Sequence, residues 1–319
     1  MKPVFRSNLF AMILILIWIM GSVLVGLMKV GLDFLGIDFP YLAQIILPQI
    51  LFLLLPCILY ILITGTNAKD TFRFYSLNIK SIFLVIGFAL SIQPLMMLIS
   101  GIGSLFFSNP VNEMLEQISE MPLALMIVMI GITPALFEEL PFRGIILSGY
   151  KNISTLQAAL LSGLFFGVLH MNFQQFIYAF VMGVFFAYLV EITGSIFSSM
   201  IAHFTINSSQ VLFSQLALWA MKTQSIENMA GLSNPSFQEK ILSIITILPL
   251  VLFLTPLAFL LMYILCKEHD KNWDSLFKLK QTSSLVAMES VNEEKIITWP
   301  VYVSIGIFII FSIFIEIVM

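Results

Sequence analysis

Charge is what this sequence has least of. Lys, Arg, Asp and Glu make up 10% of its 319 residues, whereas roughly 25% is usual for a soluble globular domain. Hydrophobic residues make up 59%, and the mean hydropathy is +1.01. This composition excludes a soluble enzyme or binding module, and a formal net charge of −3 gives no basis for a nucleic-acid partner.

Several chemical signatures are also missing. The chain has only two cysteines, Cys57 and Cys266, and both lie in apolar runs, so they are predicted to be buried thiols. It contains no His-Glu-x-x-His motif, no serine in a nucleophile-elbow context and no aspartate pair with aspartyl-protease spacing. A zincin, a serine hydrolase and an aspartyl protease are therefore disfavoured.

Long apolar runs are what the sequence has in abundance. Runs of about 20 residues are long enough to cross about 30 Å of hydrocarbon. We read nine of them: 8–30, 41–65, 81–107, 122–149, 155–172, 174–191, 195–219, 241–266 and 299–318. They predict an all-α fold, a polytopic membrane helix bundle of about nine transmembrane helices, eight in the core and one extra at the C-terminus.

The basic residues predict the orientation of this bundle. With a cytoplasmic N-terminus, twelve of the 15 Lys and Arg residues fall on the cytoplasmic side, and only Lys29, Lys222 and Lys240 fall outside. The predicted domains are a bundle at 1–266 with a motif core at about 120–215, a cytoplasmic linker at 267–298 and a C-terminal transmembrane helix at 299–319.

One apolar run contains charges, which is costly in a membrane unless they are paired or solvated. Glu138, Glu139 and Arg143 lie within the run 122–149. Glu139 and Arg143 are spaced four residues apart, so they are predicted to pair on one helical face. Glu138 lies about 100° around the helix, which leaves it as the freer carboxylate.

Three further polar residues lie at a similar depth in other runs. His170 shares a helical face with Phe166, and His203 shares one with Asn207. Counted from the cytoplasmic ends at 1.5 Å per residue, Glu138, His170 and His203 lie roughly 18, 22 and 12 Å into the membrane. The sequence therefore predicts a single site near mid-membrane, open toward the cytoplasmic half.

These residue types fit the hydrolysis of an amide. A glutamate beside a histidine can hold and deprotonate a water molecule. A second histidine, with an asparagine one turn later, can donate hydrogen bonds to a developing oxyanion. The alternative is a divalent metal such as zinc, bound by Glu138, His170 and His203 with one position left open.

The three motifs together resemble the signature of a known family. They are Glu138-Glu139-x-x-x-Arg143, Phe166-x-x-x-His170 and His203-x-x-x-Asn207. This order on successive spans is similar to the CPBP (Abi) family, the CAAX-protease and bacteriocin-processing membrane endopeptidases related to type II CAAX prenyl endopeptidases. The resemblance covers about residues 120–215.

The resemblance implies a role for each motif residue. It implies that Glu138 and His170 activate the water, and that His203 and Asn207 stabilise the oxyanion. Glu139 and Arg143 then support the site. The family is described both as metalloproteases and as glutamate-type enzymes, and we expect no tightly bound zinc.

The function predicted on this basis is that of an intramembrane endopeptidase in a bacterial plasma membrane. Its partners are the lipid bilayer and a membrane-associated peptide or protein substrate, in CAAX-type processing, in maturation of a bacteriocin or signalling peptide, or in immunity. One alternative is a non-catalytic immunity or scaffold protein whose polar residues only hold helices together. Another is a transporter with a proton relay, although no paired repeat of interrupted helices is found.

Overall fold

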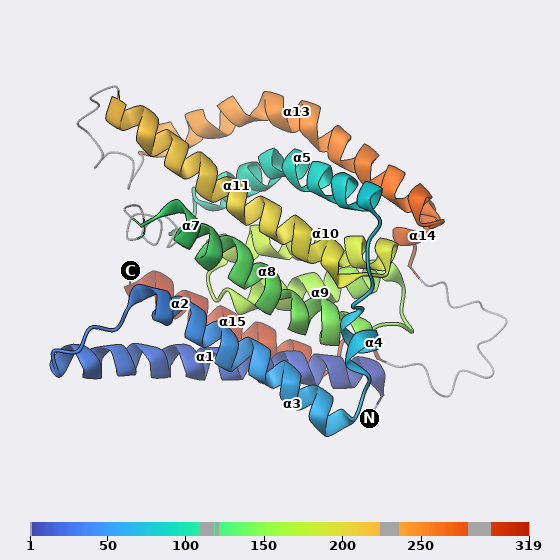
Figure 1. Cartoon of the computed structure of the whole chain (residues 1–319), viewed down its shortest axis with the longest axis horizontal. Helices are drawn as coiled ribbons and strands as arrows, with labels where there is room; N and C mark the ends of the chain where they lie inside the picture. Colours follow the sequence, from blue (N-terminus) through green and yellow to red (C-terminus); the bar gives the residue numbers. More distant parts are fainter. Residues whose placement is uncertain (1, 109–117, 119–120, 224–235, 280–294, 319) are drawn as a thin grey trace.

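The computed structural model describes residues 2–108, 118, 121–223, 236–279 and 295–318. Every regular element in these ranges is helical, which confirms the all-α prediction (Figure 1). In chain order they are α1 (Pro3–Phe34), α2 (Tyr41–Gln49), η1 (Ile50–Leu54), α3 (Leu55–Thr64), α4 (Ala68–Phe72), α5 (Ile79–Gly103), α7 (Leu123–Met126), η2 (Ile127–Ile132), α8 (Thr133–Phe137), η3 (Leu140–Ile146), α9 (Thr155–Leu169), α10 (Phe173–Thr193), α11 (Ile196–Thr223), α13 (Phe237–Glu268), α14 (Trp273–Leu276) and α15 (Trp299–Val318).

The chain is a multi-pass membrane protein. Within the described ranges, 7 helices are long and apolar enough to cross a membrane. Each of the nine predicted runs contains helix, but α9 and α11 are not among these seven. The 15 residues of α9 span only about 22 Å at 1.5 Å per residue, which is less than the hydrocarbon thickness. The count of nine spans and the cytoplasmic N-terminus stay predictions.

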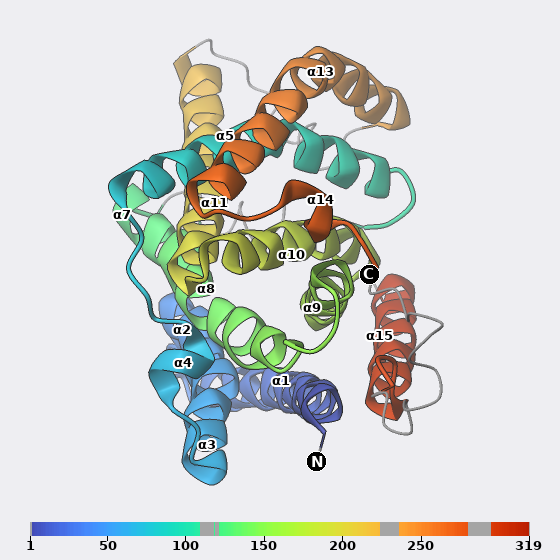
Figure 2. The same ribbon diagram turned by 90° about the vertical axis from the view of Figure 1, so that its right-hand side faces the viewer.

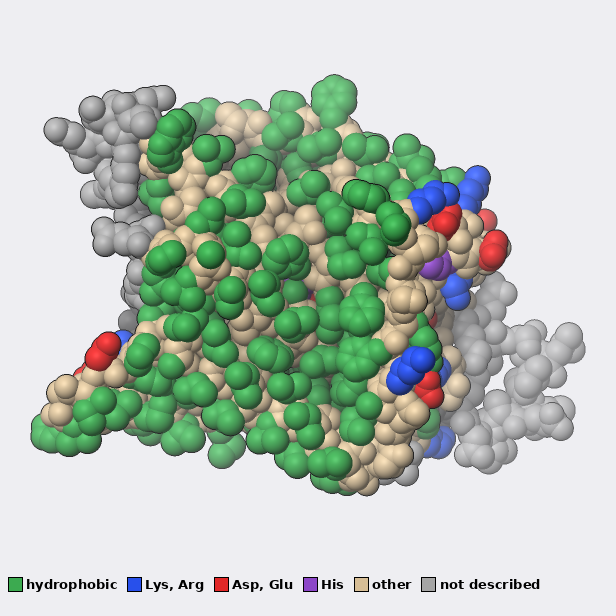
Figure 3. Space-filling model, viewed as in Figure 1, with side chains coloured by type: hydrophobic (Ala, Val, Ile, Leu, Met, Phe, Trp, Pro, Cys, Tyr) green, Lys and Arg blue, Asp and Glu red, His purple; other side chains and the backbone are tan. Residues whose placement is uncertain are grey.

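The surface has the character expected of a protein embedded in lipid. Hydrophobic side chains cover the face seen in Figure 3 between its two ends, and most of the Lys and Arg side chains in this view gather near the end where the N-terminus lies. Helix α13 illustrates the apolar belt, because Leu252 and Phe253 are 73% and 79% exposed. Side chains of this kind are stable on the outside only where lipid replaces water.

Helices α9 and α10 lie at the centre of the bundle. In the view of Figure 2, α5 and α13 cover them on one side, α1 lies on the opposite side, and α15 packs beside α9. Two glycines bring α9 and α10 together, since a Cβ atom on Gly183 would lie 2.7 Å from the Cα of Gly163. A backbone approach this close requires glycine on both helices.

The span that carries the paired glutamates is not a regular helix. It runs through α7, the π-helical turns η2, the short helix α8 and the π-helical turns η3. Pro134 and Pro141 have no N–H group to donate, and a proline ring clashes with the carbonyl group one turn earlier. The wider π turns accommodate this disruption. Glu138 and Glu139 therefore lie at the break between α8 and η3.

Parts of two segments between the predicted runs fall outside the described residues. One carries Glu113, Glu116 and Glu120, between the third and fourth runs, and the other is residues 280–294 of the predicted linker. The first part of that linker is described, and it contains the single-turn helix α14. The Tyr188 hydroxyl of α10 donates a hydrogen bond to the Leu276 carbonyl of α14 at 3.3 Å, which fastens the linker's start to the bundle.

Candidate active site

Glu139 is the centre of a fully buried polar cluster. Its Oε1 atom accepts a hydrogen bond from Arg143 Nη1 at 3.2 Å, and both side chains are 0% exposed. The same oxygen lies 2.9 Å from Nδ1 of His203, a residue 64 positions later in the chain. The pairing of Glu139 with Arg143 expected from their spacing is thus present, and His203 is added to it.

The guanidinium of Arg143 is held by backbone and aromatic groups as well. Its Nη2 atom donates to the Gly183 carbonyl of α10 at 3.2 Å. The guanidinium carbon lies 4.3 Å from the ring centroid of Phe166 and 5.2 Å from that of Phe186. Cation–π contacts are strongest where water is excluded, as it is here. The close approach of α9 and α10 at Gly163 and Gly183 allows both contacts.

Phe166 connects the two histidines of the site. Its ring centroid lies 5.1 Å from that of His170 and 5.9 Å from that of His203, with edge-on geometry in both cases. His203 also packs against Phe186 at 5.2 Å. The three motifs, which lie on three separate segments of the chain, therefore meet around one buried aromatic ring.

Glu138 differs from Glu139 both in burial and in hydrogen bonding. Its side chain is only partly buried, and it forms no hydrogen bond or ion pair with any described residue. It still lies within electrostatic range of His203 and Arg143, and also of Tyr178 on α10. The cluster contains two carboxylates and one guanidinium, and Glu139 takes the guanidinium. Glu138 is the carboxylate that remains available.

His170 ends α9 and is fixed through one ring nitrogen. Its Nδ1 atom lies 2.9 Å from the Phe166 carbonyl oxygen, which can only accept, so Nδ1 carries the proton. In the neutral imidazole the Nε2 atom then has a free lone pair. His170 can accept a proton or a hydrogen bond through that atom.

Asn207 is fixed by a hydrogen bond to the backbone of a neighbouring segment. Its Nδ2 group donates to the Ile130 carbonyl of η2 at 2.9 Å. A π turn shifts the helical hydrogen-bonding pattern from i−4 to i−5, and a carbonyl at such a turn can bind a side chain. One N–H of the Asn207 amide is used in this way, and one remains.

The alternative of a bound divalent metal requires at least three side-chain ligands that converge on one point. Among the residues that the structure describes, no group of three or more His, Cys, Asp or Glu side chains converges to hold a metal ion. Glu139 is already occupied by Arg143 and His203. The described arrangement therefore does not fit a three-ligand site at Glu138, His170 and His203.

Three neighbours of the site were not found from the sequence: the Gly183 carbonyl, Phe186 and Tyr178. A carbonyl leaves no signal in a sequence, and one Phe among 30 is not distinctive. The glycines were the only available signal, because Gly163 and Gly167 are spaced for close helix packing.

One family model matches the part of the chain that contains the site. Residues 120–209 match the family model described as "Type II CAAX prenyl endopeptidase Rce1-like". This range contains all three motifs and confirms the family predicted from them. No curated protein and no solved structure was found to match the chain.

Proposed function

We propose that this chain, whose residues 120–209 match the type II CAAX prenyl endopeptidase (Rce1-like) family of membrane proteases, cleaves peptide bonds of membrane-associated substrates with a water molecule activated by Glu138 and His170. The observation that carries the proposal is that two adjacent glutamates differ in their bonding partners. The Oε1 atom of Glu139 contacts both Arg143 and His203, whereas Glu138 has no such partner among the described residues.

The proposed first step places the water between Glu138 and the Nε2 atom of His170. Glu138 removes a proton as the water oxygen attacks the carbonyl carbon of the substrate. The bond that forms is carbon to oxygen, and the carbonyl becomes an oxyanion. Glu138 then gives its proton to the departing amine as the carbon–nitrogen bond breaks, so the carboxylate is regenerated.

The oxyanion is stabilised by His203 and Asn207 in this proposal. Because His203 directs Nδ1 toward Glu139, Nε2 can donate a hydrogen bond only when the ring is an imidazolium. The unused N–H of Asn207 is the second donor. Removing one oxyanion donor of this kind typically costs about 10²–10³ in kcat.

The proposal also covers the domain organisation and the location of the protein. We assign the catalytic core to about residues 120–215 of a bundle at 1–266, and the segments 267–298 and 299–319 to a linker and an accessory helix. The protein is assigned to a bacterial plasma membrane, where it takes part in maturation of an exported peptide or in immunity.

Comparative peptidomics tests this function without requiring that the substrate be identified first. Cells with the wild-type chain are compared with cells carrying Glu138→Gln or His203→Ala at equal protein levels in the membrane. An uncleaved peptide should accumulate in both variants, and its products should disappear. A peptide profile unchanged from wild type in both variants refutes the catalytic role and supports the scaffold alternative.

A further inference from the structure

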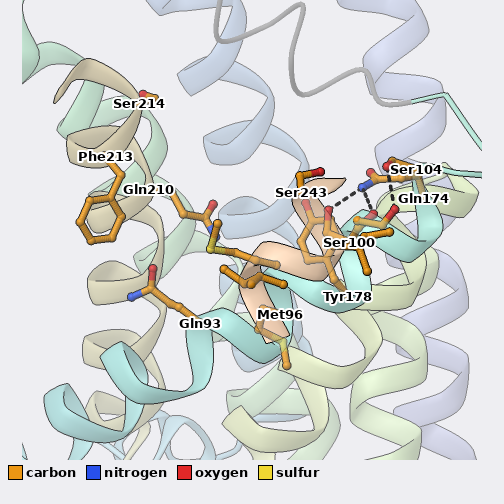
Figure 4. Close-up of a pocket in the computed structure, with 14 residues that line it drawn as sticks. Gln93, Met96, Ser100, Ser104, Gln174, Tyr178, Gln210, Phe213, Ser214 and Ser243 are labelled. Carbon is orange, nitrogen blue, oxygen red and sulfur yellow. Dashed lines mark hydrogen bonds between the residues drawn. The ribbon is translucent and has the colours of Figure 1, made fainter. Parts of the chain in front are cut away.

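A cavity of about 450 Å³ lies between α5, α10, α11 and α13, outside the polar cluster (Figure 4). This volume falls in the range of about 300–1,000 Å³ that is usual for ligand sites. Apolar atoms make up most of the cavity wall. Met97 and Phe213 line it and are 53% and 59% exposed, so the cavity opens sideways onto the surface that lipid covers.

A lysine lies at one end of this cavity. The Lys240 ammonium of α13 donates a hydrogen bond to the carbonyl of Ser104, the C-cap of α5, with Nζ and the oxygen 2.7 Å apart. Ser104 lines the cavity, and so does Ser243, which lies one turn after Lys240 on the same face of α13. Lys240 forms no ion pair with any described residue, and the neighbouring Glu239 carboxylate accepts from the Ser236 backbone N–H at 2.7 Å. An ammonium has three N–H donors, so Lys240 has donors left for an anion.

The wall changes from polar to apolar with distance from Lys240. On α5, Ser100 lines the cavity nearer that end, and Met97 lies about one turn deeper. On α13, Ile244 and Ile247 line it one and two turns beyond Lys240. The Ser100 hydroxyl oxygen already accepts a hydrogen bond at 2.6 Å, so its own proton is left to donate. A cation, then a hydroxyl donor, then apolar side chains is the order in which a phospholipid presents its phosphate, ester groups and acyl chains.

The other polar groups of the wall are compatible with this order. Gln93 is 5% exposed and accepts a hydrogen bond from the Ser209 hydroxyl at 2.9 Å, so its amide serves the contact of α5 with α11. The Ser214 hydroxyl donates to the Val211 carbonyl of its own helix at 2.9 Å. Figure 4 shows the Gln210 side chain directed from α11 into the cavity. The Gln210 amide is therefore a second donor that an ester carbonyl can meet.

We propose that this cavity binds one phospholipid of the surrounding bilayer, with an anionic headgroup at Lys240, an ester group at Ser100 and an acyl chain along the apolar part of the wall. The site is separate from the proposed reaction and does not depend on it. A single cation favours an anionic headgroup, because a zwitterionic headgroup brings its own cation beside the lysine. A small soluble anion would leave the apolar wall without a partner, whereas an acyl chain fills it.

Native mass spectrometry of the purified full chain tests the headgroup. The chain is mixed with phosphatidylglycerol or with phosphatidylcholine of the same acyl chains. The wild type should retain one phosphatidylglycerol about fivefold better than one phosphatidylcholine, as expected for a single lysine near a lipid headgroup. Lys240→Gln, which can still donate to the Ser104 carbonyl, should retain both lipids equally. Lys29→Gln removes an exposed lysine of α1 that does not line the cavity, so it should keep the wild-type preference.

Two tryptophan variants test the cavity. Ser214→Trp places a large ring in the cavity and should abolish retention of both lipids. Leu212→Trp is the matched control, because Leu212 lies on the same helix, is 46% exposed and does not line the cavity. Circular dichroism confirms that both variants are folded. A wild-type measurement needs no substitution: phosphatidylglycerol with a photoreactive acyl chain should crosslink mainly to peptides that contain Met97 or Ile244.

The outcomes decide the proposal. Equal retention of the two lipids by the wild type, or a preference that Lys240→Gln leaves unchanged, overturns the headgroup assignment. Crosslinks spread evenly over the apolar surface, or equal retention by Ser214→Trp and Leu212→Trp, overturn the cavity as the site. Glycerol phosphate, which has the headgroup chemistry without acyl chains, should not displace the bound lipid at equal concentration. Displacement would identify a site for small anions and overturn the lipid.

Discussion

The division of labour between Glu138 and Glu139 can be tested by making the same conservative change at each position. Glu139→Gln removes the only carboxylate bonded to Arg143 among the described residues, and the Arg143 guanidinium is 0% exposed. Breaking a buried ion pair by removing one partner costs about 3–5 kcal/mol, because the other charge remains buried. The remaining contacts of Arg143, to the Gly183 carbonyl and the Phe166 ring, do not neutralise the guanidinium charge.

Glu138→Gln is expected to leave stability within about 0.5 kcal/mol of wild type, since no ion pair or hydrogen bond is lost among the described residues. The two variants should thus differ by about 3–4 kcal/mol although they are adjacent and chemically identical. For activity we expect a large effect at Glu138. Glu138→Gln should reduce cleavage by about 10²–10⁴, the usual contribution of a general base, in a fully folded protein.

The assay is equilibrium unfolding in mixed micelles with increasing dodecyl sulfate, followed by circular dichroism. Glu191→Gln is the matched control. It removes the ion pair with Arg73, whose N–O distance is 2.7 Å but whose side chains are 12% and 26% exposed, so the loss should be at most about 1 kcal/mol. If Glu138→Gln and Glu139→Gln destabilise equally, the two carboxylates form one network and the reasoning fails.

Three further predictions follow from the same contacts. Gly183→Ala should destabilise the protein by about 1–3 kcal/mol through overpacking, because its Cβ would lie 2.7 Å from Gly163 Cα; Gly26→Ala, with nothing within 4 Å, should be neutral in the same unfolding assay, and equal effects would contradict the close-packing explanation. His170→Ala should reduce kcat at least about 10²-fold with an unchanged circular dichroism spectrum, and near-wild-type kcat would remove His170 from the mechanism. Exhaustive chelation should leave cleavage by the purified protein intact, since the described donors do not converge on a metal site; activity lost on chelation and restored by zinc would reverse that conclusion.

Helical periodicity by itself determined the local pairings. The spacing of four residues puts Glu139 and Arg143 on one face, and the structure has them 3.2 Å apart. The apolar runs likewise determined that the chain is an all-helical membrane protein, because lipid leaves helices as one of very few ways to satisfy the backbone. The order of the three motifs was enough to predict the family whose model matches residues 120–209.

Tertiary packing alone decided which helices face one another. Periodicity puts His203 and Asn207 on one face but says nothing about what that face meets. In the structure His203 bonds Glu139 at 2.9 Å, and Asn207 bonds the Ile130 carbonyl. Both contacts exist because α11 packs against η2, α8 and η3.

The cavity of about 450 Å³ between α5, α10, α11 and α13 (Figure 4) is the clearest case of a feature that only the fold creates. Gln93, Gln174 and Gln210 lie on three different helices, α5, α10 and α11. No spacing rule connects residues 36 or more positions apart along such a chain. They become one wall because α5 packs against both α10 and α11. Local sequence thus specified the chemistry of each helix, and non-local packing decided which of those groups share a site.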